Sequence, residues 1–242
     1  MLSMYKIYNE QQVPIIKCLI IKIIFISLVN ILPPYTLHYH VELLANNFYF
    51  NDSEMKKLFI ILMLMTNQIQ ANTEHQALQV AYLAGGCYWG LEELIRKIPG
   101  VLNTKVGFSG GHIKNVSYKE VTRGDTGHAE SIEIKFNSKE LSFENLLFNF
   151  FKMHNPTTIN QQGNDRGPQY RSSIFYINEE QKSISLRTID TVNKSKKWED
   201  PVITEVIAFS DFYAAEESHQ KYILKNPDGY SCHFVRKFDF TK

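Results

Sequence analysis

The sequence has few cysteines and almost no net charge, and both properties narrow the range of functions. It has three cysteines, Cys18, Cys87 and Cys232, in 242 residues. Three are too few for a disulfide scaffold, and none lies in a CxxC spacing typical of a zinc ribbon or a thioredoxin-type motif. The 26 Lys and Arg against 25 Asp and Glu leave no net field to attract nucleic acid or an anionic membrane. Partners selected by bulk charge are therefore not expected.

Internal repeats and low-complexity tracts are also absent from the sequence. Hydrophobic residues make up 44% of the chain and aromatic residues 13%, which is enough for a sizeable core. From residue 77 onward, strand-like and helix-like patterns alternate, which favours a mixed α/β sandwich with helices on a central sheet. We expect strands at 78–86, 101–111, 128–137, 171–178 and 203–209, helices at 88–100, 115–125, 142–154 and 179–194, and a long loop at 155–171.

A signal-peptide pattern lies inside the chain. Residues 55–71, MKKLFIILMLMTNQIQA, begin with a two-lysine segment, continue with an apolar run and end at Ala71, a small residue suited to cleavage. We therefore expect translation to start at Met55, and a mature domain of residues 72–242 to be exported to the periplasm or secreted. Residues 1–54 hold a 20-residue apolar stretch interrupted by two lysines, so a membrane anchor is the alternative.

The stretch GGCYWGLEEL, residues 85–94, places a cysteine where a strand turns into a helix. Two glycines permit a tight turn before Cys87, and the helix after it directs unpaired N–H groups toward the sulfur. This position favours the thiolate, the reactive form of cysteine. Tyr88 and Trp89 are suited to form an apolar wall beside a substrate.

GCYWG resembles the GCFWG signature of the A-type peptide methionine sulfoxide reductases. Three further blocks match the family in order: SYKEVTRGDTGHAE (117–130), QQGNDRGPQYRSSIF (161–175) and HQKYILKNPDGYSCHF (219–234). The resemblance covers residues 79–236. It implies an α+β fold, a two-layer α/β sandwich of ferredoxin-like plan with a mixed sheet and a long coiled C-terminal tail. It also implies an enzyme that reduces methionine S-sulfoxide, free or peptide-bound, and so repairs oxidised proteins.

The resemblance assigns the central chemistry to two residues. Cys87 matches the family nucleophile, which attacks the sulfoxide sulfur and becomes a sulfenic acid. Glu130 matches the residue that supplies a proton to the departing oxygen, which requires burial to raise its proton affinity. The pattern of GHAESIEIKF alone indicates a strand with Glu130 on its polar, exposed side, and the resemblance overrides that interpretation.

Five other residues receive implied roles around the substrate. Tyr118 and Tyr170 match tyrosines whose hydroxyls hydrogen-bond the sulfoxide oxygen. Asp165 matches a carboxylate that orients the site through water. Tyr88 and Trp89 match the pocket for the S-methyl group, although Tyr88 stands where Phe is common in the family. Its added hydroxyl needs a partner or solvent.

Cys232 matches the resolving cysteine of one group in the family. It would form a disulfide with Cys87 that thioredoxin or a similar dithiol reduces, and Gly229 would give the tail mobility. Because no further cysteine follows, we expect a two-cysteine cycle in a monomer that needs no organic cofactor or metal. His233 could assist the ionisation of Cys232, but the sequence favours a surface histidine.

Three other functions remain open at this point. A cysteine hydrolase would pair Cys87 with His219 or His233, although the C-G-[SA] pattern before the cysteine is absent. A metal site would combine Cys87, His128, His219 and Cys232, but their spacing is not typical of ligands. In an exported binding module, Cys87 would be inert.

Overall fold

Six strands form one sheet in the computed structural model, which describes residue 60 and residues 77–241. Their order across the sheet is β7-β6-β1-β3-β2-β8; β6 and β7 pair in parallel, and the other neighbours are antiparallel. The strands are β1 (Leu78–Gly85), β2 (Val101–Ser109), β3 (Ala129–Asn137), β6 (Ser172–Tyr176), β7 (Glu205–Ala208) and β8 (Phe212–Ala214). A two-stranded hairpin of β4 (Gln161–Gln162) and β5 (Asp165–Arg166) stands apart.

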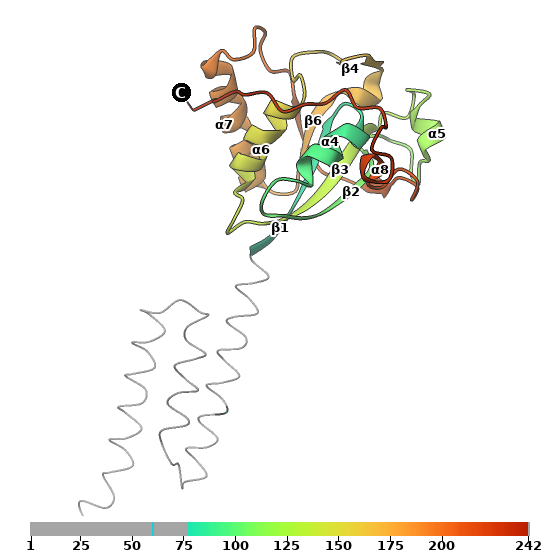
Figure 1. Cartoon of the computed structure of the whole chain (residues 1–242), viewed down its shortest axis with the longest axis horizontal. Helices are drawn as coiled ribbons and strands as arrows, with labels where there is room; N and C mark the ends of the chain where they lie inside the picture. Colours follow the sequence, from blue (N-terminus) through green and yellow to red (C-terminus); the bar gives the residue numbers. More distant parts are fainter. Residues whose placement is uncertain (1–59, 61–76, 242) are drawn as a thin grey trace, which may run out of the picture. The chain divides into compact units, whose positions relative to one another are not determined.

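Helices lie against one face of this sheet, as Figure 1 shows for α4, α6 and α7. The helices are α4 (Tyr88–Ile95), α5 (Tyr118–Val121), α6 (Phe143–Met153), α7 (Glu179–Ser195) and α8 (Tyr222–Lys225), with a 3-10 turn at Pro168–Tyr170. The central strands β6-β1-β3-β2, connected through α4 and α6, have the ferredoxin-like order. The expected α+β sandwich with a mixed sheet is therefore confirmed.

Local sequence signals explain where the long helices begin. Ser142 accepts a hydrogen bond from the Asn145 N–H (3.1 Å) and caps α6. Asn178 accepts one from the Gln181 N–H (2.8 Å) and caps α7 in the same way. Helix α4 ends at Ile95, earlier than expected, and a turn leads into β2.

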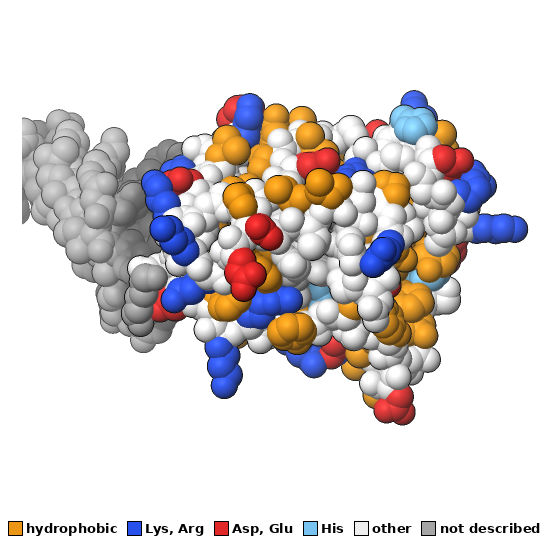
Figure 2. Space-filling view, turned by 90° about the horizontal axis from the view of Figure 1, so that it is seen from above, with side chains coloured by type: hydrophobic (Ala, Val, Ile, Leu, Met, Phe, Trp, Pro, Cys, Tyr) orange, Lys and Arg blue, Asp and Glu red, His pale blue; other side chains and the backbone are white. Residues whose placement is uncertain are grey.

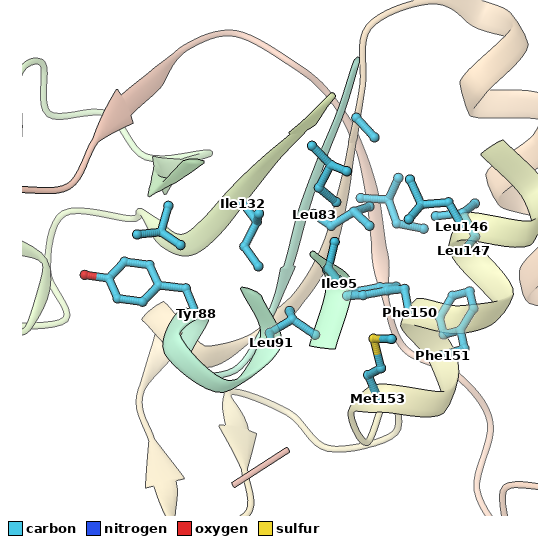
Figure 3. Close-up of a cluster of buried hydrophobic side chains, with 14 of the residues drawn as sticks. Leu83, Tyr88, Leu91, Ile95, Ile132, Leu146, Leu147, Phe150, Phe151 and Met153 are labelled. Carbon is cyan, nitrogen blue, oxygen red and sulfur yellow. The ribbon is translucent and has the colours of Figure 1, made fainter. Parts of the chain in front are cut away.

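The core lies between the sheet and the helices. Leu83 of β1 and Ile132 of β3 are fully buried and pack with Ile95 of α4 and Phe150 of α6, as Figure 3 shows. Because Leu83 and Ile132 are paired in register and point to the same face of the sheet, they fix α4 and α6 at that face. The start of α4, which carries Cys87, is fixed by this packing.

The C-terminal tail passes over the helices, and Figure 1 shows it crossing α4 and α6. The Arg236 N–H donates to the Lys152 carbonyl at the end of α6 (3.0 Å). A Cβ atom on Gly90 of α4 would collide with Ser231 Oγ of the tail. The expected coiled tail is therefore present and packs closely on the helix that begins at the cysteine.

The expectations for residues 1–54 and 55–71 lie outside the described residues. Within the part that the structure describes, no helix has both the length and the apolar character needed to cross a membrane. The surface in Figure 2 has Lys and Arg interspersed with Asp and Glu, in keeping with the balanced composition.

Candidate active site

Cys87 lies directly before α4, at the end of the central strand β1, and is only 7% exposed. The turn requires glycine, because Gly86 has φ +96° and a Cβ atom there would lie 2.5 Å from Gln162 Cγ. Cys87 and Cys232 are both free thiols. The strand-to-helix position that the sequence predicts for Cys87 is confirmed.

The expected thiolate is not the resting form of Cys87. Burial raises the pKa of the Cys87 thiol, and the nearby Glu130 carboxyl raises it further, while a hydrogen bond from the backbone N–H of Trp89 lowers it. The helix N-terminus therefore acts in the expected direction, but desolvation is the larger effect. The thiol stays protonated at neutral pH until a substrate or partner changes its surroundings.

Glu130 is buried on the face of β3 that points toward the helices. It is 2% exposed and shares that face with Ile132 and Ile134, because side chains alternate along a strand. The interpretation from its own segment, an exposed Glu130, is therefore wrong. Its Oε2 accepts a hydrogen bond from the Tyr88 N–H (3.1 Å), the backbone donor that follows Cys87. Burial raises the pKa of Glu130 to about 8, so the carboxyl carries a proton at pH 7.

Two tyrosine hydroxyls lie within the electrostatic reach of the same groups. Burial and then the charge of Glu130 raise the pKa of Tyr118, which starts α5, and Cys87 and Asp165 add to the effect. Burial and then Glu130 also raise the pKa of Tyr170, at the end of the 3-10 turn. The structure therefore brings both phenols to the site as neutral hydrogen-bond donors.

Cys232 of the tail meets Asp165 of the β4–β5 hairpin. The Cys232 thiol donates to Asp165 Oδ2 (3.0 Å), and the Tyr230 hydroxyl donates to Asp165 Oδ1 (3.3 Å). Burial and the hydrogen bond to Asp165 raise the pKa of Cys232 to about 12. The electrostatic influence of both Asp165 and Cys232 reaches Cys87, which places the second thiol at the same site.

Tyr88 and Trp89 follow the cysteine but differ in their surroundings. Tyr88 is 1% exposed and packs against Phe108, with ring centroids 5.9 Å apart. Its ring points away from most of the core cluster in Figure 3, and its buried hydroxyl has no hydrogen-bond partner among the residues that the structure describes. Trp89 is partly exposed and stacks on Tyr222 at 3.9 Å. Trp89 is therefore the more accessible of the two proposed pocket walls.

The histidines of the alternative functions do not pair with Cys87. His219 Nδ1 accepts a hydrogen bond from the Trp89 indole N–H (3.1 Å). His128 uses both ring nitrogens, with the Gly111 N–H (3.2 Å) and with the Ile113 carbonyl (2.8 Å). His233 is buried rather than on the surface, since its tail segment is pressed onto α4. Within residues 77–241, no group of three or more potential ligands is placed to hold a metal ion.

Sequence reasoning missed a second buried carboxylate, Glu92 of α4. It is 1% exposed and accepts hydrogen bonds from the Thr104 hydroxyl (2.8 Å) and the Lys221 N–H (2.8 Å). These bonds join α4 to β2 and to the tail. The available signal was its position on the helix, because Glu92 lies four residues after Tyr88 and three before Ile95 on the buried face.

A buried thiol beside a protonated carboxyl, with a second thiol on the overlying tail, defines a thiol-based reductase on a ferredoxin-like fold. The sequence pattern described as peptide methionine sulfoxide reductase matches residues 79–242. The chain belongs to this family and is of its A type. It is an oxidoreductase, and its activity is the thiol-dependent reduction of methionine sulfoxide.

Individual relatives agree with this assignment. The chain is 53% identical over 156 residues to peptide methionine sulfoxide reductase MsrA 2 of Rhodopirellula baltica, covering 64% of this chain and 90% of the relative. It is 51% identical over 158 residues to the MsrA of Mycobacterium tuberculosis strain H37Rv, covering 65% and 85%. The structure resembles reduced Mxr1 from Saccharomyces cerevisiae, with a TM-score of 0.64, 35% identity and coverage of 67% and 94%. It also resembles methionine sulfoxide reductase A of Corynebacterium diphtheriae, with a TM-score of 0.61, 33% identity and coverage of 64% and 78%.

Proposed function

We propose that Cys87 and Glu130 carry out the reduction step on methionine S-sulfoxide. The Cys87 sulfur attacks the sulfoxide sulfur, the S–O bond of the substrate breaks, and the oxygen passes to the Cys87 sulfur, which gives methionine and a Cys87 sulfenic acid. The protonated Glu130 carboxyl supplies a proton to that oxygen as negative charge develops on it. The proton lost by the Cys87 thiol replaces the one that Glu130 gives up, so no external oxidant or reductant is needed in this step. Tyr118 and Tyr170 donate hydrogen bonds to the same oxygen, and Trp89 borders the methyl group.

Cys232 then completes the cycle. Its sulfur attacks the Cys87 sulfenic sulfur, a disulfide forms, and the oxygen leaves as water. An external dithiol protein of the thioredoxin type reduces this disulfide by thiol exchange and restores both thiols.

One observation carries the proposal for the first step. Glu130 is buried beside the cysteine, holds a proton near neutral pH and is fixed by the N–H that follows Cys87. A carboxyl in this condition is a proton donor placed next to a nucleophile. No comparable donor is needed for a structural cysteine.

Single-turnover reduction tests the assignment of both cysteines. The wild type, Cys87→Ser and Cys232→Ser are mixed with a peptide containing either the S- or the R-sulfoxide, without and then with thioredoxin. We expect the wild type to release methionine from the S-sulfoxide only, Cys87→Ser to release none, and Cys232→Ser to stall after one equivalent. Release by Cys87→Ser, or equal use of both sulfoxides, would contradict the proposal.

We also propose that the mature protein is exported and monomeric. Support for export comes from the signal-peptide pattern of residues 55–71. Mass spectrometry of the native protein should find a chain that begins near residue 72, and retention of residues 1–54 would instead support an anchor. Light scattering should give the mass of one chain.

A further inference from the structure

The imidazole of His233 is fixed in one tautomer beside the second thiol. Its Nε2 lies 2.8 Å from the Gly85 carbonyl oxygen, which can only accept a hydrogen bond, so Nε2 carries the proton. Its Nδ1 therefore presents a lone pair, and this atom lies 3.4 Å from Cys232 Sγ. The histidine thus offers a proton acceptor to the thiol of its neighbour in the chain.

The backbone around Cys87 holds this ring in place. A Cβ atom on Gly86 would lie 3.1 Å from His233 Nε2, and one on Gly90 would lie 3.0 Å from Nδ1. Larger residues on either side of the cysteine would therefore crowd the imidazole. The His233 N–H also donates to Ser231 Oγ (3.3 Å), which fixes the tail next to the ring. The orientation of Nδ1 toward sulfur is therefore set by the hydrogen bond of Nε2 to the Gly85 carbonyl, by the bond to Ser231 and by the absence of side chains at the two glycines.

The surroundings of His233 keep it neutral and able to accept a proton. Burial lowers its pKa, the Gly85 carbonyl and the charge of Asp165 raise it, and Arg236 lowers it. The titratable or charged groups that face it are Cys232 and Arg236 of the tail, Asp165 of the hairpin and His154 at the end of α6. With the pKa of Cys232 at about 12, roughly one molecule in 10⁵ holds that thiol ionised at pH 7. The resolving thiol therefore needs a base.

We propose that His233 is the general base of the resolving step, an assignment that rests on the proposed roles of Cys87 and Cys232. His233 Nδ1 takes the proton from Cys232 Sγ as this sulfur attacks the sulfur of the Cys87 sulfenic acid. The S–S bond forms while the S–O bond of the sulfenic acid breaks. The leaving hydroxide takes up one proton and departs as water, so the step needs no external oxidant or reductant.

Asp165 is the other acceptor near Cys232, at 3.0 Å from the sulfur. The negative charge of Asp165 opposes a second anion on the adjacent sulfur, whereas the neutral imidazole of His233 carries no such charge. Asp165 therefore holds the resting thiol, while His233 Nδ1 offers an uncharged acceptor for its proton.

His233→Gln tests this assignment, because the glutamine amide can donate to the Gly85 carbonyl but cannot accept a proton at pH 7. The full chain is mixed with one equivalent of methionine sulfoxide peptide without a donor, across pH 5 to 9. Quenched samples give methionine release, sulfenic acid trapped with dimedone, and disulfide by mass. His112→Gln makes the same exchange at an exposed histidine and serves as the control.

We expect His233→Gln to release methionine at nearly the wild-type rate, to accumulate sulfenic acid, and to form the disulfide about 10²-fold more slowly at pH 7. Its disulfide rate should rise about tenfold per pH unit through pH 9, while the wild-type rate levels off once His233 is neutral. Turnover with dithiothreitol, which bypasses Cys232, should stay near the wild-type value.

Two results would overturn the assignment. In one, His233→Gln forms the disulfide with the wild-type rate and pH profile. In the other, methionine release and dithiothreitol turnover fall together with the disulfide rate, which means that His233 only supports the Cys87 turn. If the wild type itself releases no methionine or forms no disulfide, the proposed function fails instead, so the two failures are distinguishable.

Discussion

Exchange of Glu130 for Gln gives a quantitative test of the buried carboxyl. Burial raises the pKa of Glu130 from 4.5 to about 8, so the folded protein binds this proton more tightly than the unfolded chain does. A raised pKa of this kind gives stability that is fully present below the unfolded value and is lost as the pH rises through the folded one. Between these limits the wild type loses about 1.4 kcal/mol per pH unit relative to a neutral amide.

The expected result is a difference that depends on pH. We compare the unfolding free energy of Glu130→Gln with that of the wild type at each pH. The variant should be more stable by nearly nothing at pH 4.5 and by about 3 kcal/mol at pH 7, and the difference should become constant above pH 8. Urea unfolding at five pH values between 4.5 and 9 measures it. Glu133→Gln is the matched control, because it makes the same exchange on the same strand, at a carboxylate that accepts a hydrogen bond from the Tyr82 hydroxyl.

The same variant tests the proton transfer. Methionine release by the wild type should be constant at neutral pH and fall about tenfold per unit above pH 8, as Glu130 loses its proton. Glu130→Gln should release methionine about 10²-fold to 10⁴-fold more slowly, while Glu133→Gln keeps the wild-type rate and profile. A stability difference that does not vary with pH would refute the raised pKa, and a fully active Glu130→Gln would refute the role as acid.

Three further exchanges follow from single contacts. Tyr88→Phe removes a buried hydroxyl that has no partner within the described part of the chain, so the unfolding free energy should rise by about 1 kcal/mol and the Tm by about 2–4 °C in calorimetry. A lower Tm would contradict this. Gly90→Ala forces a Cβ atom against Ser231 Oγ and displaces the tail. Quenched-flow assays should therefore show disulfide formation at least tenfold slower, while turnover with dithiothreitol is retained. An unchanged disulfide rate would contradict the observed packing of the tail on α4. Ser142→Ala removes the acceptor for the Asn145 N–H and should cost about 1 kcal/mol in urea unfolding without affecting methionine release.

The strands and helices of the core follow from local patterns in the sequence. Alternation in residues 128–137 predicts β3, and the helix expected at 142–154 corresponds to α6; both are confirmed. The same alternation also predicts that Glu130 is buried, because an even number of positions separates it from Ile132 and Ile134, so all three lie on one face of the strand. An assignment by polarity alone placed this residue on the wrong face, whereas its position in the repeat places it in the core.

The contacts of the tail depend on residues far apart in the chain, and no local pattern encodes them. His233 meets a carbonyl 148 positions earlier, and the Lys221 N–H meets Glu92 129 positions earlier. The short strand β8 and the hairpin β4–β5 also escaped prediction, since two or three residues carry no usable periodicity. The third glycine of the motif, Gly90, is explained only when the tail is seen lying against it.

The protonation of Cys87 shows how tertiary burial changes the meaning of a local motif. A helix N-terminus favours the thiolate, but this effect is small and is confined to the first turn of the helix. Desolvation of the nearly buried Cys87 sulfur disfavours the thiolate more strongly. Since peroxides react with thiolates, we expect a neutral Cys87 to react slowly with them before a substrate binds. Glu130 is neutral for the same reason, so thiol and carboxyl form an uncharged pair in the resting site. Charge then develops only when the polar sulfoxide oxygen enters, because this oxygen can accept the protons that the Cys87 thiol and the Glu130 carboxyl hold.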